Sequence, residues 1–472
     1  MLDILIHDAV VLTMTGQGVG ALDRGAVGIK DDKIEIAGPN QRIKNKYKAH
    51  RYIKAENKVV MPGLVDSHIH TGLAILRGLS QDINNWMEAG IWPFAREIKI
   101  EDKKAGSMLN IIEGVKAGTT TFCDYNADMD TLVENHIKMG TRARIAETIN
   151  EMPEKIEQND GNFLYPLDKS VGNRKLEKAI DLVEKWHQEE NGRITCLFGP
   201  QGPDMLSREL LLEVKRLAEK YDTKIHMHVA QGDREIKQML ARYDQRSIPW
   251  LQELNYLDER LMAVHMTEAN DQEVKTLANS GASLIICSGS IGIIDGIIPP
   301  LSEFLRDGSK AALGSDQAPG NNCNNMFNEM KFTAILNKCK ARDPTVLPAA
   351  KVLRLATIKA AEAIGLEKQI GSIEAGKKAD LIIVDFTKPE LSPLINKPIR
   401  NVVPNLVYSA RGHEVETVMV DGEIIMEERK LKNLDEKKAI SRAQTRAQEL
   451  AERSEDNIED HSLLTAMKNN KL

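Results

Sequence analysis

The sequence predicts an α/β protein whose largest part is a (β/α)8 barrel, and two observations carry that prediction. Short apolar stretches alternate with helical patterns between Val59 and about Gly314, which implies a parallel sheet. Eight such units suit a closed barrel, whose active sites lie at the carboxyl ends of the strands. An open doubly wound sheet is the alternative, but the chain has no GxGxxG after an early strand and no P-loop.

The first barrel strand is expected in Val59–Thr71, an apolar run that turns at Pro62–Gly63 and ends in DSHIH. Seven further strands are expected at Thr119–Cys123, Ala143–Glu147, Ile194–Phe198, Lys224–Val229, Leu261–His265, Ala282–Cys287 and Lys310–Leu313. Helical patterns lie between them, for example at Glu101–Lys116, Arg174–Glu189, Ser207–Lys220 and Asp271–Asn279.

Both ends of the chain differ from this pattern. Strands with intervening turns are expected before the barrel, at Ile4–Met14, Ala26–Lys30, Lys33–Ala37 and Tyr52–Val60, and again after it, at Gly371–Ile373, Asp380–Asp385, Glu416–Val420 and Glu423–Met426. We therefore expect a small β-sandwich built from residues 1–58 and 369–428, a barrel over residues 59–368, and a charged helical tail over residues 429–472.

Composition excludes several classes of protein. The 472 residues are 42% apolar and 28% charged, as in ordinary globular proteins, and the net charge of −6 gives no nucleic-acid footprint. No apolar run approaches the length of a membrane span, and the N-terminus lacks a basic segment typical of a signal peptide. Five scattered cysteines without a CxxC pair favour free thiols in the cytoplasm.

Metal-ligand residue types stand at the ends of four expected strands. His68 and His70 are two residues apart, so they project from the same face of the first strand. His228 ends the fifth strand, His265 the sixth and Asp316 the eighth. Each alone is more often structural, but together three imidazoles and a carboxylate would leave an open position for water. A metal ion there would lower the pKa of that water toward neutrality.

On these residues the chain resembles the amidohydrolase superfamily. The matching stretches are PGLVDSHIH (Pro62–His70), His228, His265, GSD (Gly314–Asp316) and GSIEAGKKAD (Gly371–Asp380). Within the superfamily it is similar to the cytosine-deaminase-like branch, which includes methylthioadenosine/S-adenosylhomocysteine deaminases, guanine deaminases and triazine hydrolases of the atrazine chlorohydrolase type. The resemblance covers residues 1 to about 428.

The resemblance implies a hydrolase that attacks a ring carbon of a nitrogen heterocycle with metal-bound hydroxide, by deamination or dechlorination. It implies one divalent metal per subunit, zinc or else iron, held by His68, His70, His228 and Asp316. Asp316 would also be the general base, and His265 would stand beside the reacting atoms. A homo-oligomer is expected, with a small heterocycle as the substrate and no nucleic-acid or membrane partner.

One position departs from the family pattern. Family deaminases carry a proton-shuttling glutamate three residues after the strand-five histidine, where this chain has Gln231. An amide cannot shuttle a proton. Three interpretations follow: the substrate needs less protonation, another acid such as His265 or Asp233 acts, or the chain is a weakened, inactive or engineered relative that binds a ligand without turnover.

The substrate pocket is expected around the loop after the first strand. Its aromatic side chains would stack on a flat ring, although plain packing of a long loop is the alternative. Polar contacts to ring nitrogens are expected from Gln231 and from residues that follow strand eight. The predicted substrate contacts are Trp86, Trp92, Phe94, Gln231, Asn321, Asn322 and Cys323, with Leu73 beside them.

Overall fold

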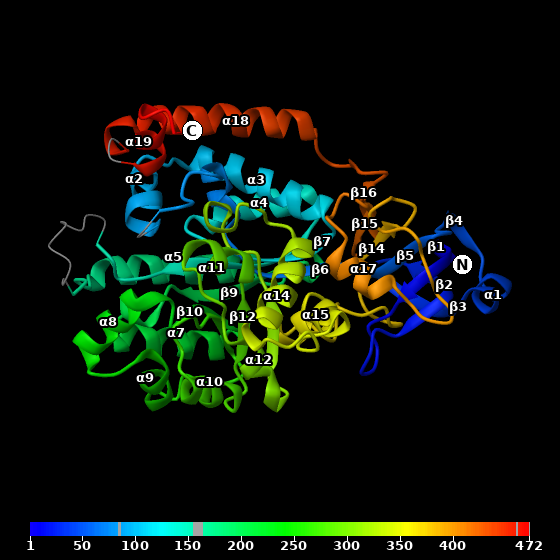
Figure 1. Cartoon of the computed structure of the whole chain (residues 1–472), viewed down its shortest axis with the longest axis horizontal. Coiled ribbons are helices and arrows are strands. Elements are labelled where there is room, and N and C mark those ends of the chain that lie inside the picture. The colour runs from blue at the N-terminus through cyan, green and yellow to red at the C-terminus, as the bar shows by residue number, and fades with distance from the viewer. Residues whose placement is uncertain (84–85, 154–163, 459–460, 472) are drawn as a thin grey trace.

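The computed structural model describes residues 1–83, 86–153, 164–458 and 461–471, and the predicted barrel is confirmed (Figure 1). Eight strands follow one another in sequence order within one sheet, and each register between neighbours is parallel. They are β6 (Leu64–Ile69), β7 (Thr119–Asn126), β8 (Arg142–Ile149), β9 (Ile194–Pro200), β10 (Ile225–Val229), β11 (Leu261–His265), β12 (Ser283–Ile286) and β13 (Lys310–Leu313).

The last strand returns to the first, because Ile69 and Asp316 form a parallel bridge. Every residue of β6, β7 and β9 is buried, as expected for strands covered on both faces. The covering helices include α3 (Ile100–Lys116), α4 (Met129–Met139), α5 (Lys169–Trp186), α7 (Arg208–Lys220), α8 (Gly232–Tyr243), α9 (Ser247–Glu253), α10 (Asp271–Ala278), α11 (Ser288–Ile294), α14 (Met326–Ala341), α15 (Ala349–Leu355) and α16 (Ile358–Ile364).

Helix α7 shows why these segments become helices. The Ser207 hydroxyl caps its N-terminus by accepting a hydrogen bond from the backbone N–H of Leu210. The buried side chains recur with helical spacing, so one apolar stripe faces the barrel; they are Leu210, Leu211, Val214, Leu217 and Ala218.

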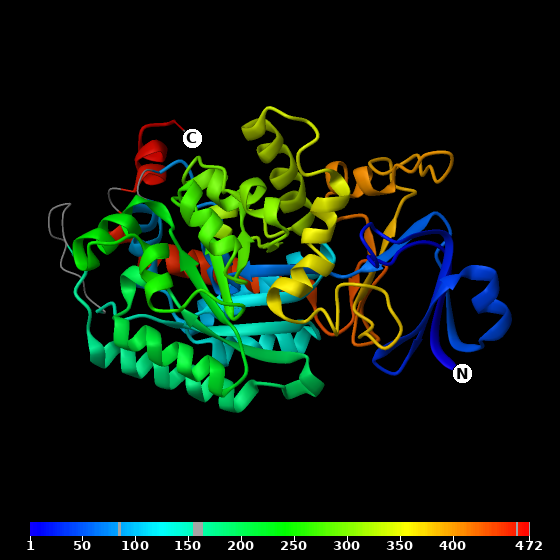
Figure 2. The ribbon, with the colours of Figure 1, turned by 90° about the horizontal axis from the view of Figure 1, so that it is seen from below.

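A second sheet of nine strands combines both ends of the chain, and Figure 2 shows its blue N-terminal and orange C-terminal segments together beside the barrel. Strand β5 pairs with β1 on one side and with β14 on the other. The strands are β1 (Leu2–Leu12), β2 (Ala21–Lys30), β3 (Lys33–Pro39), β4 (Ala49–Lys54), β5 (Lys58–Pro62), β14 (Leu381–Asp385), β15 (Val415–Val420), β16 (Glu423–Glu427) and β17 (Lys430–Leu431).

The structure divides the expected first strand between the two sheets. Residues up to Pro62 belong to β5, and the barrel begins at Leu64, so the change of sheet falls at Gly63 rather than between residues 58 and 59. A Cβ on Gly63 would lie 2.1 Å from the Thr120 hydroxyl oxygen, so only glycine fits this crossing. The expected strand Gly371–Ile373 is instead a bend whose Ile373 N–H donates to the Thr13 carbonyl.

The tail forms α18 (Glu436–Arg453) and α19 (Ser462–Lys468), and Figure 1 shows α18 lying along α3. The Arg446 and Arg453 guanidinium groups both reach the fully buried carboxylate of Asp102. Ala443 and Leu450 of α18 are buried with the apolar side chains of the loop after β6, namely Ile75, Leu76, Ile91 and Phe94. The tail therefore completes the core beneath that loop.

Across the described ranges, none of the helices combines the length and apolar character that crossing a lipid bilayer demands.

Buried ion pairs join the two sheets. Arg142 at the start of β8 is 1% exposed and donates to both oxygens of Asp380, at 2.7 and 3.1 Å. The same guanidinium also donates to Asp421 in the turn between β15 and β16. Two carboxylates thus share one buried cation.

We expect Arg142→Met to destabilise the protein by about 3–5 kcal/mol, because it leaves the buried carboxylate of Asp380 without its cation. Chemical denaturation followed by circular dichroism measures this loss. Arg216→Met removes an arginine from an exposed pair with Glu213 on α7 and should hardly shift the midpoint. Equal midpoints for both variants would contradict the assigned role of Arg142.

Candidate metal centre

A cavity of ≈ 330 Å³ lies at the carboxyl end of the barrel strands. His70, His228, His265 and Asp316 line it together with Gln231. The predicted ligands therefore come from β6, β10 and the turn after β13, although they are far apart in the sequence.

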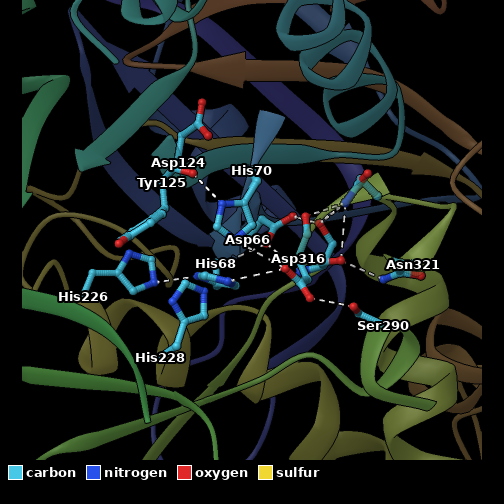
Figure 3. A network of polar contacts seen from close by, with 12 residues as sticks. Asp66, His68, His70, Asp124, Tyr125, His226, His228, Ser290, Asp316 and Asn321 are labelled. Atoms are coloured by element: carbon cyan, nitrogen blue, oxygen red, sulfur yellow. Dashed lines mark hydrogen bonds and ion pairs between the residues drawn. The ribbon is translucent and has the colours of Figure 1, made fainter. Parts of the chain in front are cut away.

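Figure 3 shows the side chains of His68, His70, His228 and Asp316 gathered together. Nε2 of His68 and Nε2 of His70 lie 3.6 and 3.5 Å from Oδ1 of Asp316. Ligand atoms of His68, His70 and Asp316 all lie within 4.8 Å of one another, and the same holds for His68, His228 and His265. The four predicted ligands thus fall into two groups that share His68, and one of these groups also contains His265.

The second ring nitrogen fixes the tautomer of each histidine. Nδ1 of His70 lies 2.6 Å from the Tyr125 carbonyl oxygen, and Nδ1 of His228 lies 2.7 Å from that of Gln201. A carbonyl only accepts, so both Nδ1 atoms carry the proton and both Nε2 atoms keep a lone pair. A carbonyl partner of this kind orients metal-ligating histidines in proteins.

His68 is oriented by His226, whose Nε2 lies 2.9 Å from Nδ1 of His68. His226 lies on β10 two residues before His228, and through this contact it acts on a candidate ligand as a neighbour. Among the described residues, Nε2 of His68 and Oδ1 of Asp316 have no hydrogen-bond partner although both are buried. Buried polar atoms are rarely left unpaired, so this pair fits a cation between them.

Asp316 is held by its other oxygen and by its backbone. Ser290 donates to Oδ2 at 2.6 Å, which leaves Oδ1 facing the imidazoles. The backbone φ of Asp316 is 60° and that of His265 is 77°, a left-handed conformation that costs energy for residues with a side chain. Strain at both positions supports their assignment to a functional site.

Burial favours the neutral form of His68, His228 and His265. It lowers the pKa of His68 and His228 well below the usual value, and it lowers the pKa of His265 to about 4. Burial would raise the pKa of Asp316, but the close approach of His68 Nε2 and the electrostatic influence of His265 and His70 hold that pKa below its usual value. Neutral imidazoles and an ionised carboxylate are the forms that bind divalent metals.

Gln231 lines the cavity directly after β10. Its backbone N–H and that of Ala230 donate to the two carboxylate oxygens of Glu235, at 2.8 and 2.7 Å. Burial, followed by the charge of Asp204, raises the pKa of Glu235 to about 7. Asp233, considered above as a substitute acid, instead points to solvent and pairs with Lys237 at 2.6 Å.

The predicted substrate contacts divide into two groups. Trp86, Trp92, Gln231 and Leu73 line the cavity. Phe94, Asn321, Asn322 and Cys323 are not among the residues on its wall.

Each of the four is engaged elsewhere. Phe94 is buried and faces His461 of the tail, with 5.6 Å between ring centroids. The Asn321 amide donates to the Ser315 carbonyl at 2.8 Å. Asn322 is exposed, and Cys323 accepts a hydrogen bond from Asn328. Asn321, Asn322 and Cys323 follow strand eight, and their turn packs against α11 and against the loop after β6.

Sequence reasoning missed several residues of the cavity wall. Gln201 and Asp204 follow β9, and Arg234 and Glu235 lie in the first turns of α8. Gln201 and Asp204 follow the fourth barrel strand, a position typical of active-site residues. Neither belongs to the family motifs quoted above.

Comparisons with known proteins agree with this geometry. Residues 59–425 match the profile described as Amidohydrolase family. A 5-methylthioadenosine/S-adenosylhomocysteine deaminase of Moorella thermoacetica is 33% identical over 434 residues, or 92% of this chain and 96% of that protein. A 5'-deoxyadenosine deaminase of Methanosarcina mazei is 34% identical over 455 residues, or 96% and 99%.

Solved structures share the fold. An adenosine deaminase of Xanthomonas campestris with bound zinc has a TM-score of 0.87 and 27% identity, covering 95% of this chain and 98% of that one. An atrazine chlorohydrolase of Arthrobacter aurescens complexed with zinc has a TM-score of 0.82 and 19% identity, covering 94% and 100%. The second likeness concerns the fold alone.

We expect the double variant His68→Ala/His70→Ala to lose bound metal, because two of the nitrogen donors disappear from a site with few ligands. Elemental analysis after dialysis against a weak chelator measures the metal per chain. His50→Ala, at an exposed position in β4, is the matched control and should keep its metal. Full metal content in the double variant would place the ion elsewhere.

Proposed function

This chain belongs to the amidohydrolase family, and on that premise we propose that it is a metal-dependent hydrolase of nitrogen heterocycles. The reaction replaces an amino group or a halide on a ring carbon with hydroxyl, consuming water and releasing ammonia or the halide acid. The observation that carries this proposal is the pair of ligand groups that share His68, one with His70 and Asp316 and one with His228 and His265. His70, His228 and Asp316 line the cavity at the barrel mouth. Among the described residues, Nε2 of His68 and Oδ1 of Asp316 have no hydrogen-bond partner.

We propose that these four residues hold one divalent ion per chain, zinc before iron. Nitrogen and carboxylate donors suit both metals, and the zinc bound in the adenosine deaminase structure at 27% identity supports the choice. Such an ion would supply Lewis-acid activation of water. The chain itself supplies the base, the positioning groups and the shape of the cavity. We also propose, as expected from the resemblance, that the protein is cytoplasmic and forms a homo-oligomer.

Asp316 is the proposed base. Its Oδ1 faces the open space among the imidazoles, while Ser290 holds Oδ2 at 2.6 Å and prevents rotation of the carboxylate. A carboxylate so placed accepts the proton of the attacking water. His265 lies next to it, and among the described residues neither of its ring nitrogens has a hydrogen-bond partner. We assign His265 to hydrogen bonding with the substrate atom that gains charge during attack.

Adenosine-type nucleosides are the first candidate substrates. The relatives at 33% and 34% identity are named as deaminases of 5-methylthioadenosine/S-adenosylhomocysteine and of 5'-deoxyadenosine, and they align over nearly the whole chain. Trp86 and Trp92 on the cavity wall provide faces for stacking on a purine. The family match also weighs against a non-catalytic binding protein.

Gln231 favours a second candidate, removal of a better leaving group from a triazine-like ring. An amide can hold a ring nitrogen by a hydrogen bond but cannot protonate it. A chloride needs no such protonation to leave, so this substitution is less costly for dechlorination than for deamination.

The wild-type protein loaded with zinc should release ammonia or chloride from one member of a panel of adenosine-type nucleosides, aminotriazines and chlorotriazines. His265→Ala should reduce that rate by about 10²–10³-fold, because a donor or acceptor aimed at developing charge is lost. Coupled ammonia detection and chloride electrodes give the rates. If the wild type and His265→Ala release ammonia and chloride at the same low rate from every compound, the proposal that this protein is an enzyme is wrong.

Gln231→Glu separates the two candidates. If the substrate is an amino heterocycle, restoring a general acid should raise deamination by about 10²-fold or more. Gln252→Glu adds the same charge at an exposed position of α9 and should leave the rate unchanged. A Gln231→Glu rate at or below wild type on every amino heterocycle would exclude a deaminase-like arrangement around this position.

A further inference from the structure

Asp204 is a buried carboxylate on the cavity wall that the proposed reaction does not use. It lies in a short 3-10 turn, Pro203–Met205, directly after β9, and its side chain is 1% exposed. The turn is fixed because the Met205 N–H donates to the Gly202 carbonyl at 3.0 Å. The backbone that carries Asp204 is therefore fixed, and its side chain is buried rather than directed into solvent.

Both carboxylate oxygens of Asp204 are buried without a hydrogen-bond partner among the described residues. A buried carboxylate in this state is unusual, since it offers about four acceptor sites and carries a charge. Asp204 lines the cavity. A molecule bound in the cavity can therefore donate the hydrogen bonds that the carboxylate lacks.

The charge of Asp204 is already balanced. Nη1 of Arg234, in the first turn of α8, lies 3.3 Å from Oδ2 of Asp204 without forming a hydrogen bond. A second cation on this carboxylate would sit close to the guanidinium and be repelled by it. Neutral N–H or O–H groups fit both the free acceptor sites and the local charge.

We propose that Asp204, held against Arg234, determines specificity by accepting hydrogen bonds from neutral donor groups at the non-reacting end of the substrate. This inference rests on the proposed function, because it places the substrate in the same cavity. Two kinds of substrate carry such donors: the 2'- and 3'-hydroxyls of a nucleoside, and the alkylamino N–H groups of a triazine. The shared chemistry is a set of neutral donors away from the carbon under attack.

The test measures binding rather than turnover, by titration calorimetry on the full-length, zinc-loaded chain in a His265→Ala background that slows consumption of ligand. Each probe is paired with a partner that lacks the donors. Adenosine is compared with 2',3'-dideoxyadenosine, and a bis(alkylamino)chlorotriazine is compared with its bis(dialkylamino) counterpart. Asp204→Asn is the test variant. Asp222→Asn, on a side chain that is 91% exposed, is the control.

We expect Asp204→Asn to weaken binding of the donor-bearing member of one pair by roughly 10–100-fold, as for loss of a hydrogen bond to a charged group. Binding of the donor-free member should not change, and Asp222→Asn should match the parent throughout. The pair that responds identifies the source of the donors. If Asp204→Asn does not yield folded, zinc-loaded protein, Asp204→Ser with the same pairs decides the matter.

Equal effects of Asp204→Asn on both members of each pair, or no effect on either pair, would overturn the role of Asp204. Failure of the proposed function looks different. Selective binding that depends on Asp204, together with no turnover of the panel by the wild-type chain, would reject the reaction and keep the specificity site.

Discussion

The closure of the barrel between its first and last strands is the constraint on which the site depends. The Asp316 N–H donates to the His68 carbonyl at 2.8 Å, so the ends of β6 and β13 are in direct contact. A Cβ on Gly314 would lie 2.8 Å from the backbone N and O of His68, and only glycine permits this approach. Without it, the carboxylate of residue 316 could not face the imidazoles of residues 68 and 70.

Each candidate ligand is oriented by a hydrogen bond with a neighbouring group. Backbone carbonyls orient His70 and His228, an imidazole orients His68, and a hydroxyl orients Asp316. Each contact uses the atom that is not directed into the cavity. The donor set is therefore organised by the protein before any ion arrives, which reduces the cost of ordering on binding.

The regular parts of this arrangement could be predicted from the sequence, because they follow from periodicity. Alternating side chains place His68 and His70 on one face, and parallel strands bring residues that follow them to one edge. The sequence predicts the turn at Pro62–Gly63, but not that the chain changes sheet there, since the residues on both sides of the turn are apolar. Asp204 was missed because its irregular turn has no periodicity. The partner of the Asn321 amide nitrogen, the Ser315 carbonyl, lies in a turn whose geometry periodicity does not describe.

The crossing at Gly63 has a consequence for how the protein is made. Strand β5 leaves the ribosome early, yet its antiparallel partner β14 begins only at Leu381. At ordinary translation rates, on the order of tens of seconds separate the two. During that interval one edge of β5 has no strand to pair with, and an open apolar edge is a site of aggregation. Expression of this chain therefore depends on protecting that edge until the barrel has been synthesised.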